Sequence, residues 1–211
     1  MPRTTKKTSR RTSSKARGSR PSPSGSVEEA LAAVGRAMKA VGARWYLFGA
    51  QAVALHGVPR ATQDIDVTAL VDSGTAALLT ALTAEGITPR FDDAEFIATT
   101  RVIPADHRAS GWKIDVVLGG PGLEELIASE AVVRRIGRAT VPLLRLEHLL
   151  TLKTLADRPR DVADVSRLLA VHRARVTADE VRGLLRALEQ ALAEDGLVAR
   201  FDRLLAEARR R

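Results

Sequence analysis

The amino-acid sequence predicts a mixed α/β (α+β) fold, in which a mixed sheet with flanking helices is followed by an all-helical C-terminal part. Two patterns indicate this fold. Up to residue 143, short apolar or alternating segments typical of strands are interleaved with segments of helical periodicity. From Glu147 onward the periodicity is helical throughout. The hydrophobic content of 45% is enough for one core, or for one core with a helical annex.

The first helix is predicted to begin at Val27 and to end near Gly42. Ser26 and Glu29 have the spacing of a capping box, in which the serine hydroxyl accepts from the Glu29 amide and the glutamate reaches back. The apolar residues that follow recur at helical spacing: Ala30, Leu31, Val34, Met38 and Val41.

The next segments alternate between strand and helix patterns. A short aromatic and apolar segment at 44–48 is predicted to be a buried strand, ended by Gly49. Further strands are predicted at 64–70, 95–103 and 112–118, with one or two short strands within 132–143. Helices are predicted at 50–56 and 73–85.

The C-terminal helical region has two predicted breaks, one near Arg158-Pro159 and one over 172–176. A second capping-box sequence, from Thr177 to Glu180, predicts the start of the penultimate helix.

The net charge of +8 is concentrated at the N-terminus. Residues 1–26 hold eight basic side chains and no acid, so residues 27–211 carry 25 basic and 25 acidic groups. This distribution excludes a basic surface spread over the fold. Because residues 1–26 are almost without apolar side chains, we expect a disordered basic tail there. Such a tail would either tether the protein to RNA or DNA, or serve as a tolerated extension; its composition also fits an organellar transit peptide.

Other totals exclude several classes. The chain contains no cysteine, which excludes disulfides, thiol nucleophiles and cysteine zinc sites. The longest uncharged stretches fall short of the roughly 20 apolar residues of a membrane span, and no apolar secretory signal is present. We therefore expect a cytoplasmic protein with no membrane partner.

Two acids in one predicted strand are the first candidate for chemistry. Asp64 and Asp66 flank Ile65, and alternation in a strand places both carboxylates on the same face. Like charges about 4 Å apart repel by roughly 4 kcal/mol at an effective dielectric of 20, unless a cation, a proton or solvent relieves them. Paired carboxylates are good Mg²⁺ ligands, although a solvated strand face would account for the pair equally well.

Two further features accompany this pair. Gly49 and Ala50 form a small-residue turn between a strand and a helix, which either exposes amides to a phosphate or is simply a tight turn. Asp115 lies among β-branched residues in a predicted core strand, where a lone carboxylate is costly to bury. It would be a third metal ligand, or a strand-end acid paired with Lys113.

Together these features resemble the nucleotidyltransferase fold superfamily, to which DNA polymerase beta belongs. The features that match are an apolar strand, a Gly-small turn, Asp-apolar-Asp thirteen residues later, and then a strand with a third Asp. The segments 49–57 and 60–66 look like the AbiEii-type (type IV toxin) branch. Residues 149–153 and 157–165 resemble the helical motif of that branch. The resemblance covers roughly residues 45–170. Ala50 stands where the superfamily usually has Gly or Ser.

The resemblance implies that Asp64, Asp66 and Asp115 are catalytic and hold two Mg²⁺ ions, with Asp115 as the candidate base. It also implies a set of nucleotide-binding residues: Gly49, Ala50, Gln51, Arg60, Thr62 and Lys153. Lys153 would alternatively orient Asp161 or Asp164. Arg158, Asp161 and Asp164 form a possible second motif, or else a salt-bridged helix start.

The expected activity is transfer of NMP from an NTP to a hydroxyl acceptor, either RNA such as tRNA or a protein. RNA would be contacted by residues 1–26, and an antitoxin-like protein partner would fit the toxin-like branch. The alternatives are an antibiotic nucleotidyltransferase and a catalytically inactive binding module. We expect three parts: the tail at 1–26, a nucleotidyltransferase core at 27–145 and a helical region at 146–211.

Overall fold

The computed structural model describes residues 25–91 and 93–210. The prediction of a disordered tail therefore concerns residues that, up to residue 24, lie outside the described part. Within the described ranges, no helix combines the length and the apolar character that crossing a membrane requires.

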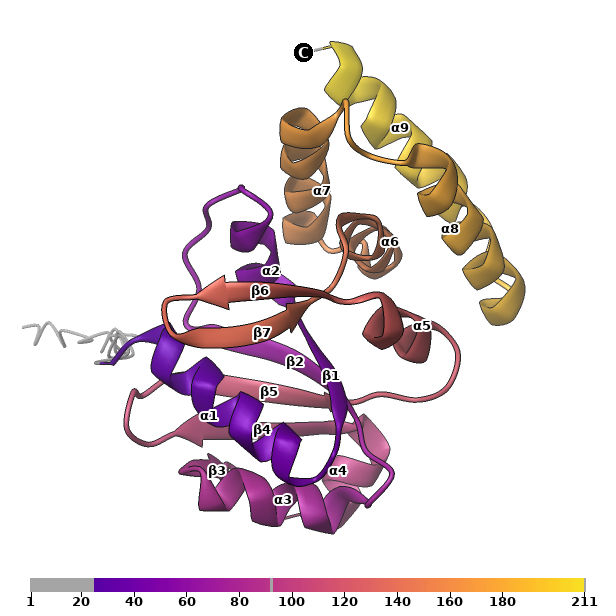
Figure 1. Ribbon diagram of the computed structural model, residues 1–211. Coiled ribbons are helices and arrows are strands. Elements are labelled where there is room, and N and C mark those ends of the chain that lie inside the picture. The colour runs from indigo at the N-terminus through magenta and orange to yellow at the C-terminus, as the bar shows by residue number, and fades with distance from the viewer. Residues whose placement is uncertain (1–24, 92, 211) are drawn as a thin grey trace, which may run out of the picture.

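A seven-stranded mixed sheet forms the centre of the described part, in the order β3-β4-β5-β2-β1-β7-β6 (Figure 1). Two neighbouring pairs, β2–β5 and β1–β7, are parallel, and the other pairs are antiparallel. The predicted mixed sheet is confirmed. The strands are β1 Arg44–Phe48, β2 Asp64–Leu70, β3 Ile87–Pro89, β4 Val102–His107, β5 Lys113–Leu118, β6 Val132–Ile136 and β7 Ala139–Leu143.

Helices pack against this sheet. The helix α1 contacts both α3 and β7, while α2 lies on β2 and α5 contacts β1 and β2. The Ser26 hydroxyl caps α1 by accepting from the Glu29 amide at 3.2 Å, as the capping box predicts. These helices are α1 Val27–Ala40, α2 Gly49–Leu55, α3 Thr75–Ala84, α4 Ala94–Thr100 and α5 Leu123–Glu130.

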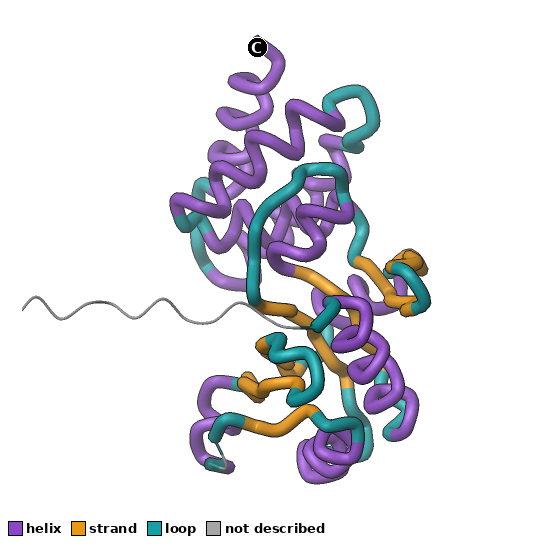
Figure 2. The backbone as a smooth tube through the Cα atoms, turned by 90° about the vertical axis from the view of Figure 1, so that its left-hand side faces the viewer, coloured by secondary structure: helices purple, strands orange, loops and turns teal. Residues whose placement is uncertain are grey.

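The C-terminal part is helical, as predicted. Figures 1 and 2 show its four helices grouped at one end of the molecule, next to the sheet. Helix α6 contacts α2, α7 and α8, and α9 contacts α7 and α8, so α6 links this group to the sheet region. The helices are α6 Leu146–Ala156, α7 Pro159–His172, α8 Ala178–Leu192 and α9 Leu197–Arg210.

The strand predicted at 95–103 is wrong. Residues Ala94–Thr100 form α4, and the strand β4 starts only at Val102. The Asp93 carboxylate caps α4 by accepting from the amides of Glu95 and Phe96 at 2.9 and 3.1 Å. A capping carboxylate satisfies amides that a helix start leaves free, and here it outweighs the strand-like composition.

Two elements, β3 and α5, were not predicted. The second capping-box sequence correctly predicts where the penultimate helix starts, since Thr177 is the N-cap residue and α8 begins at Ala178, but the predicted capping bonds are not formed. The Thr177 side chain makes no capping hydrogen bond at α8. The Glu180 carboxylate instead accepts from the Arg145 guanidinium at 2.9 Å, so a tertiary ion pair replaces the local cap.

The alternation of β2 separates the core from the candidate site. Ile65, Val67 and Ala69 are buried on one face of the strand. Asp64 and Asp66 have the opposite parity and lie on the other face, as predicted.

Candidate functional site

A row of aligned residues crosses the sheet beside the start of β2. Asp66 is the register partner of Phe48 on β1 and of Asp115 on β5. Asp115 is in turn the partner of Pro104 on β4, whose carbonyl accepts from the Arg90 amide at 2.8 Å. Because neighbouring strands lie about 4.8 Å apart, the row brings Asp66 and Asp115 side by side.

The three aspartates therefore lie on one face, as predicted from the sequence. Asp64 is two residues before Asp66, and its amide donates to the Thr62 hydroxyl at 3.2 Å. Asp66 is half-buried, and burial raises the pKa of its carboxyl group. The negative charges of Asp115 and Asp64 raise this pKa further, while the Ala50 amide and the Lys153 ammonium lower it.

Asp115 has a cationic partner. Burial raises the pKa of the Asp115 carboxyl group, and the Asp64 charge acts in the same direction. The Arg90 guanidinium opposes both, since its terminal nitrogen lies 2.5 Å from Asp115 Oδ1. The alternative partner Lys113 contributes only a weaker electrostatic effect.

Gly49 is required where it stands, between β1 and α2. Its φ of +67° lies in the left-handed region, and a Cβ at this position would come within 1.8 Å of Asp66 Oδ2. A larger residue would displace the carboxylate. In this structure the Gly49-Ala50 turn is therefore shaped around Asp66.

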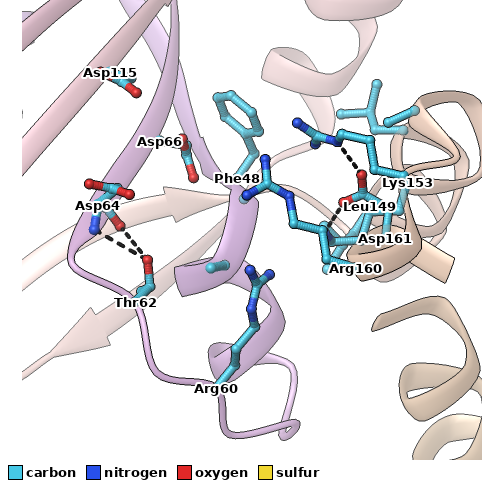
Figure 3. Close-up of a pocket in the computed structure, with 15 residues that line it drawn as sticks. Phe48, Arg60, Thr62, Asp64, Asp66, Asp115, Leu149, Lys153, Arg160 and Asp161 are labelled. Carbon is cyan, nitrogen blue, oxygen red and sulfur yellow. Dashed lines mark hydrogen bonds and ion pairs between the residues drawn. The ribbon is translucent and has the colours of Figure 1, made fainter. Parts of the chain in front are cut away.

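A cavity of about 400 Å³ opens between the aspartates and the helices α6 and α7 (Figure 3). Most of the residues predicted for the site line it, whereas Gln51 and Asp164 do not. The predicted residues in its wall are Gly49, Ala50, Arg60, Thr62, Asp64, Asp66, Asp115, Lys153, Arg158 and Asp161.

An ion-pair network forms the wall opposite the aspartates. Lys153 Nζ lies 2.9 Å from Asp161 Oδ1 and 2.8 Å from Asp164 Oδ2. Arg158 pairs with Asp161, and Arg60 pairs with Asp164 at 2.8 Å. The side chains of Lys153, Asp161 and Asp164 are 7%, 1% and 3% exposed.

This network bears on two sequence expectations. Lys153 contacts both aspartates, which is the arrangement of the alternative in which it orients them. Burial raises the pKa of the Asp161 carboxyl group, but hydrogen bonds from Arg158 and Lys153 outweigh burial and hold the pKa below its usual value. The network is thus charged and tightly paired, which leaves Lys153 and Arg60 less available to a phosphate.

Sequence reasoning missed two arginines at this site. Arg160, at the start of α7, lines the cavity and makes no ion pair among the residues that the structure describes. In Figure 3 its guanidinium points toward the side of the cavity that holds Asp66. The alternation of basic residues at 158 and 160 was a visible signal for Arg160. Nothing local marks Arg90, which directly follows β3 and reaches Asp115 on β5.

The donor set fits magnesium. Three carboxylates on one face offer the oxygen ligands that this hard ion prefers, and two of them have raised pKa values that a cation would counteract. Gly49 leaves room for Asp66 in this arrangement. Asp64, Asp66 and Asp115 could hold a metal ion in this arrangement.

A different acidic cluster lies elsewhere, at the junction of α5, α6 and α8. Within the described ranges, Glu130, His148 and Glu180 are the group whose ligand atoms all lie within 4.8 Å of one another. The Arg145 guanidinium already pairs with Glu130 at 2.7 Å and with Glu180 at 2.8 Å. Because a cation already neutralises these carboxylates, we interpret this cluster as an ion-pair junction.

Solved structures share this architecture. The antibiotic-resistance factor ANT(2'')-Ia matches with 16% sequence identity and a TM-score of 0.51, over 78% of this chain and 93% of that one. An antigenic nucleotidyltransferase-like protein from Paracoccidioides brasiliensis matches with 16% identity and a TM-score of 0.51, over 86% of this chain and 95% of that one. The fold is therefore nucleotidyltransferase-like. No protein-family model and no curated protein matches the chain.

Proposed function

We propose that the protein is a Mg²⁺-dependent nucleotidyltransferase that moves NMP from an NTP to a hydroxyl acceptor. One observation carries the proposal: Asp64, Asp66 and Asp115 share a face, across one cavity from a wall of α6 and α7 that carries Lys153, Arg158 and Arg160. Three carboxylates facing several cations suit a substrate that is both metal-bound and polyanionic.

The roles of the residues follow from this arrangement. The acceptor hydroxyl attacks the α-phosphorus, a new P–O bond forms, and pyrophosphate leaves. Asp115 accepts the hydroxyl proton, and Arg160 contacts the triphosphate because it makes no ion pair with any residue in the described ranges. Two bound magnesium ions would supply Lewis-acid stabilisation of the charge that develops on the phosphate oxygens. Gly49 and Ala50 shape the turn that holds Asp66.

Other nucleotide contacts remain predictions. Thr62 and Arg60 line the cavity and are within reach of a nucleotide there, and Gln51 stays assigned by resemblance alone. Lys153, Arg158, Asp161 and Asp164 act in this proposal by holding α7, and with it Arg160, against the cavity.

The acceptor we propose is RNA such as tRNA, or a protein, as in a type IV toxin-like enzyme of the AbiEii type with an antitoxin-like partner. The unbalanced charge of residues 1–26 supports RNA, because a segment with eight cations and no acid attracts a polyanion. A small-molecule acceptor is the second candidate, favoured by the similarity in fold to an antibiotic-resistance factor.

The experiment is a transfer assay on the full chain. Each α-³²P-labelled NTP is supplied with Mg²⁺ and with tRNA, an aminoglycoside or a cell extract, and labelled products are separated. We expect label on one acceptor class. Asp64→Asn and Asp66→Asn should each lower the rate by at least about a hundredfold, since each removes charge stabilisation at the reacting phosphate.

The control is Asp72→Asn, which removes an exposed carboxylate beyond the opposite end of β2 and should leave the rate unchanged. If the wild-type protein labels none of the three acceptor classes, a non-catalytic binding module replaces the enzyme. Label on the aminoglycoside alone would move the proposal to its second candidate.

A further inference from the structure

Arg90 contacts Asp115 from outside the strand pair that carries the aspartates. It directly follows β3, and its amide donates to the Pro104 carbonyl at 2.8 Å, which continues the pairing with β4. Its side chain then crosses β4, so that a terminal guanidinium nitrogen lies 2.5 Å from Asp115 Oδ1. The Arg90 side chain is 27% exposed and that of Asp115 is 38% exposed.

The distance to be spanned requires a long side chain. Arg90 and Asp115 lie two strands apart, which corresponds to about 10 Å between backbones. Pro104 lies between them in the row and is buried. An arginine spans this gap and presents a planar fork to the carboxylate, whereas lysine presents a single point charge.

The contact constrains one oxygen of Asp115. A carboxylate offers two oxygens with about four lone-pair positions, so Oδ1 can be held by Arg90 while Oδ2 remains available. Carboxylates that bind metals are commonly fixed in this way by a hydrogen-bonding partner outside the ligand set.

We propose that Arg90 is a positioning residue that fixes the orientation of Asp115, so that its second oxygen faces the cavity for the metal and for the acceptor proton. This inference rests on the proposed function of the same site. Arg90 itself does not line the cavity, so it acts through Asp115.

The test measures metal binding without nucleotide. Full-length wild type, Arg90→Ala, Arg90→Lys, Asp115→Asn and the double variant Arg90→Ala/Asp115→Asn are titrated with Mn²⁺, and free Mn²⁺ is followed by electron paramagnetic resonance. We expect Arg90→Ala to weaken Mn²⁺ binding about 10- to 100-fold, the range found for partners of metal ligands. Arg90→Lys should recover part of this loss.

The double variant separates positioning from a structural role. If Arg90 acts through Asp115, adding Arg90→Ala to Asp115→Asn causes no further loss, because the two effects are not additive. Arg44, on β1 of the same sheet, pairs with Glu125 of α5 at 2.8 Å. Arg44→Ala is the matched control because it removes this ion pair, and it should leave Mn²⁺ binding unchanged. Circular dichroism of each variant monitors folding.

Three results would overturn the inference. The first is unchanged or tighter Mn²⁺ binding in Arg90→Ala. The second is that Arg90→Ala lowers the Mn²⁺ affinity of Asp115→Asn by the same factor as it lowers that of wild type. The third is that Asp115→Asn alone leaves the Mn²⁺ affinity unchanged. If wild type transfers label while Arg90→Ala binds Mn²⁺ normally, only the role of Arg90 fails. Failure of the wild-type protein to bind Mn²⁺ or to transfer label would overturn the proposed function as well.

Discussion

Asp66 shows how much of the site a single residue can reveal. The side-chain alternation of β2 is local, so the sequence alone places Asp64 and Asp66 on one face with Ile65 opposite. The contact between Asp115 and Arg90 depends on sheet order, which brings residues 25 positions apart together. No periodicity encodes that order, and Arg90 therefore could not be predicted.

Asp66→Asn should stabilise the protein in the absence of metal. Burial and the charges of Asp115 and Asp64 raise the pKa of Asp66, so its ionised form is disfavoured in the folded state. Asparagine has nearly the same shape and removes this cost. We expect the free energy of unfolding at pH 7 to rise by about 0.5–2 kcal/mol, the size common for single stabilising substitutions.

The pH dependence has a defined sign. The cost in wild type is fully present above the raised pKa of Asp66 and is relieved as the pH falls through it, because the folded state then binds a proton. The advantage of Asp66→Asn should therefore shrink between pH 7 and pH 4. Urea denaturation with a chelator measures it, and a variant less stable than wild type at pH 7 would show that Asp66 is not electrostatically strained.

Local sequence patterns predict the helices and strands correctly where no tertiary contact favours a different local structure. The Ser26 cap and the helical region after Glu147 follow from sequence patterns alone. The strand prediction at 95–103 fails because the Asp93 cap starts a helix there. At Thr177 the start of α8 is predicted correctly, but the Arg145–Glu180 contact takes the place of the local capping bonds. The contacts of Lys153 with Asp161 and Asp164 could be predicted only as one of two alternatives, the other being a contact of Lys153 with the nucleotide.

Substitutions of Lys153 and Arg160 should have different effects, the first on the stability of the protein and the second on nucleotide binding. Lys153→Met leaves Asp161 and Asp164 buried with one cation fewer, so we expect a loss of about 3–5 kcal/mol in the free energy of unfolding. Arg160→Gln removes an exposed side chain, so stability should change by less than about 0.5 kcal/mol. Its affinity for an NTP should fall about tenfold or more, since a charged hydrogen bond is lost.

Urea denaturation and calorimetric titration with a non-hydrolysable NTP analogue measure the two effects. The opposite outcome, in which Lys153→Met keeps its stability and loses nucleotide affinity while Arg160→Gln binds normally, would assign the triphosphate to Lys153.

At the scale of the whole molecule, charge separates into three regions. Residues 1–26 carry the net charge of +8, while residues 27–211 are balanced at 25 basic and 25 acidic groups. Within the described part, one wall of the cavity carries three aspartates, and the opposite wall carries Arg160 beside the ion-paired Lys153, Arg158 and Asp161. The charge difference between residues 1–26 and 27–211 could be predicted from composition, and the fold class could be predicted from periodicity. That the two walls of the cavity face each other could not be predicted, because it depends on how α6 and α7 pack next to the sheet.

The proposed site is tested most directly by a crystal structure of the protein with Mn²⁺ and a non-hydrolysable NTP analogue, in which anomalous scattering locates the metal. We expect Mn²⁺ bound by Asp64, Asp66 and Asp115, with the triphosphate in the same cavity and in contact with Arg160. Mn²⁺ at Glu130, His148 and Glu180, or a nucleotide bound away from the three aspartates, would contradict it.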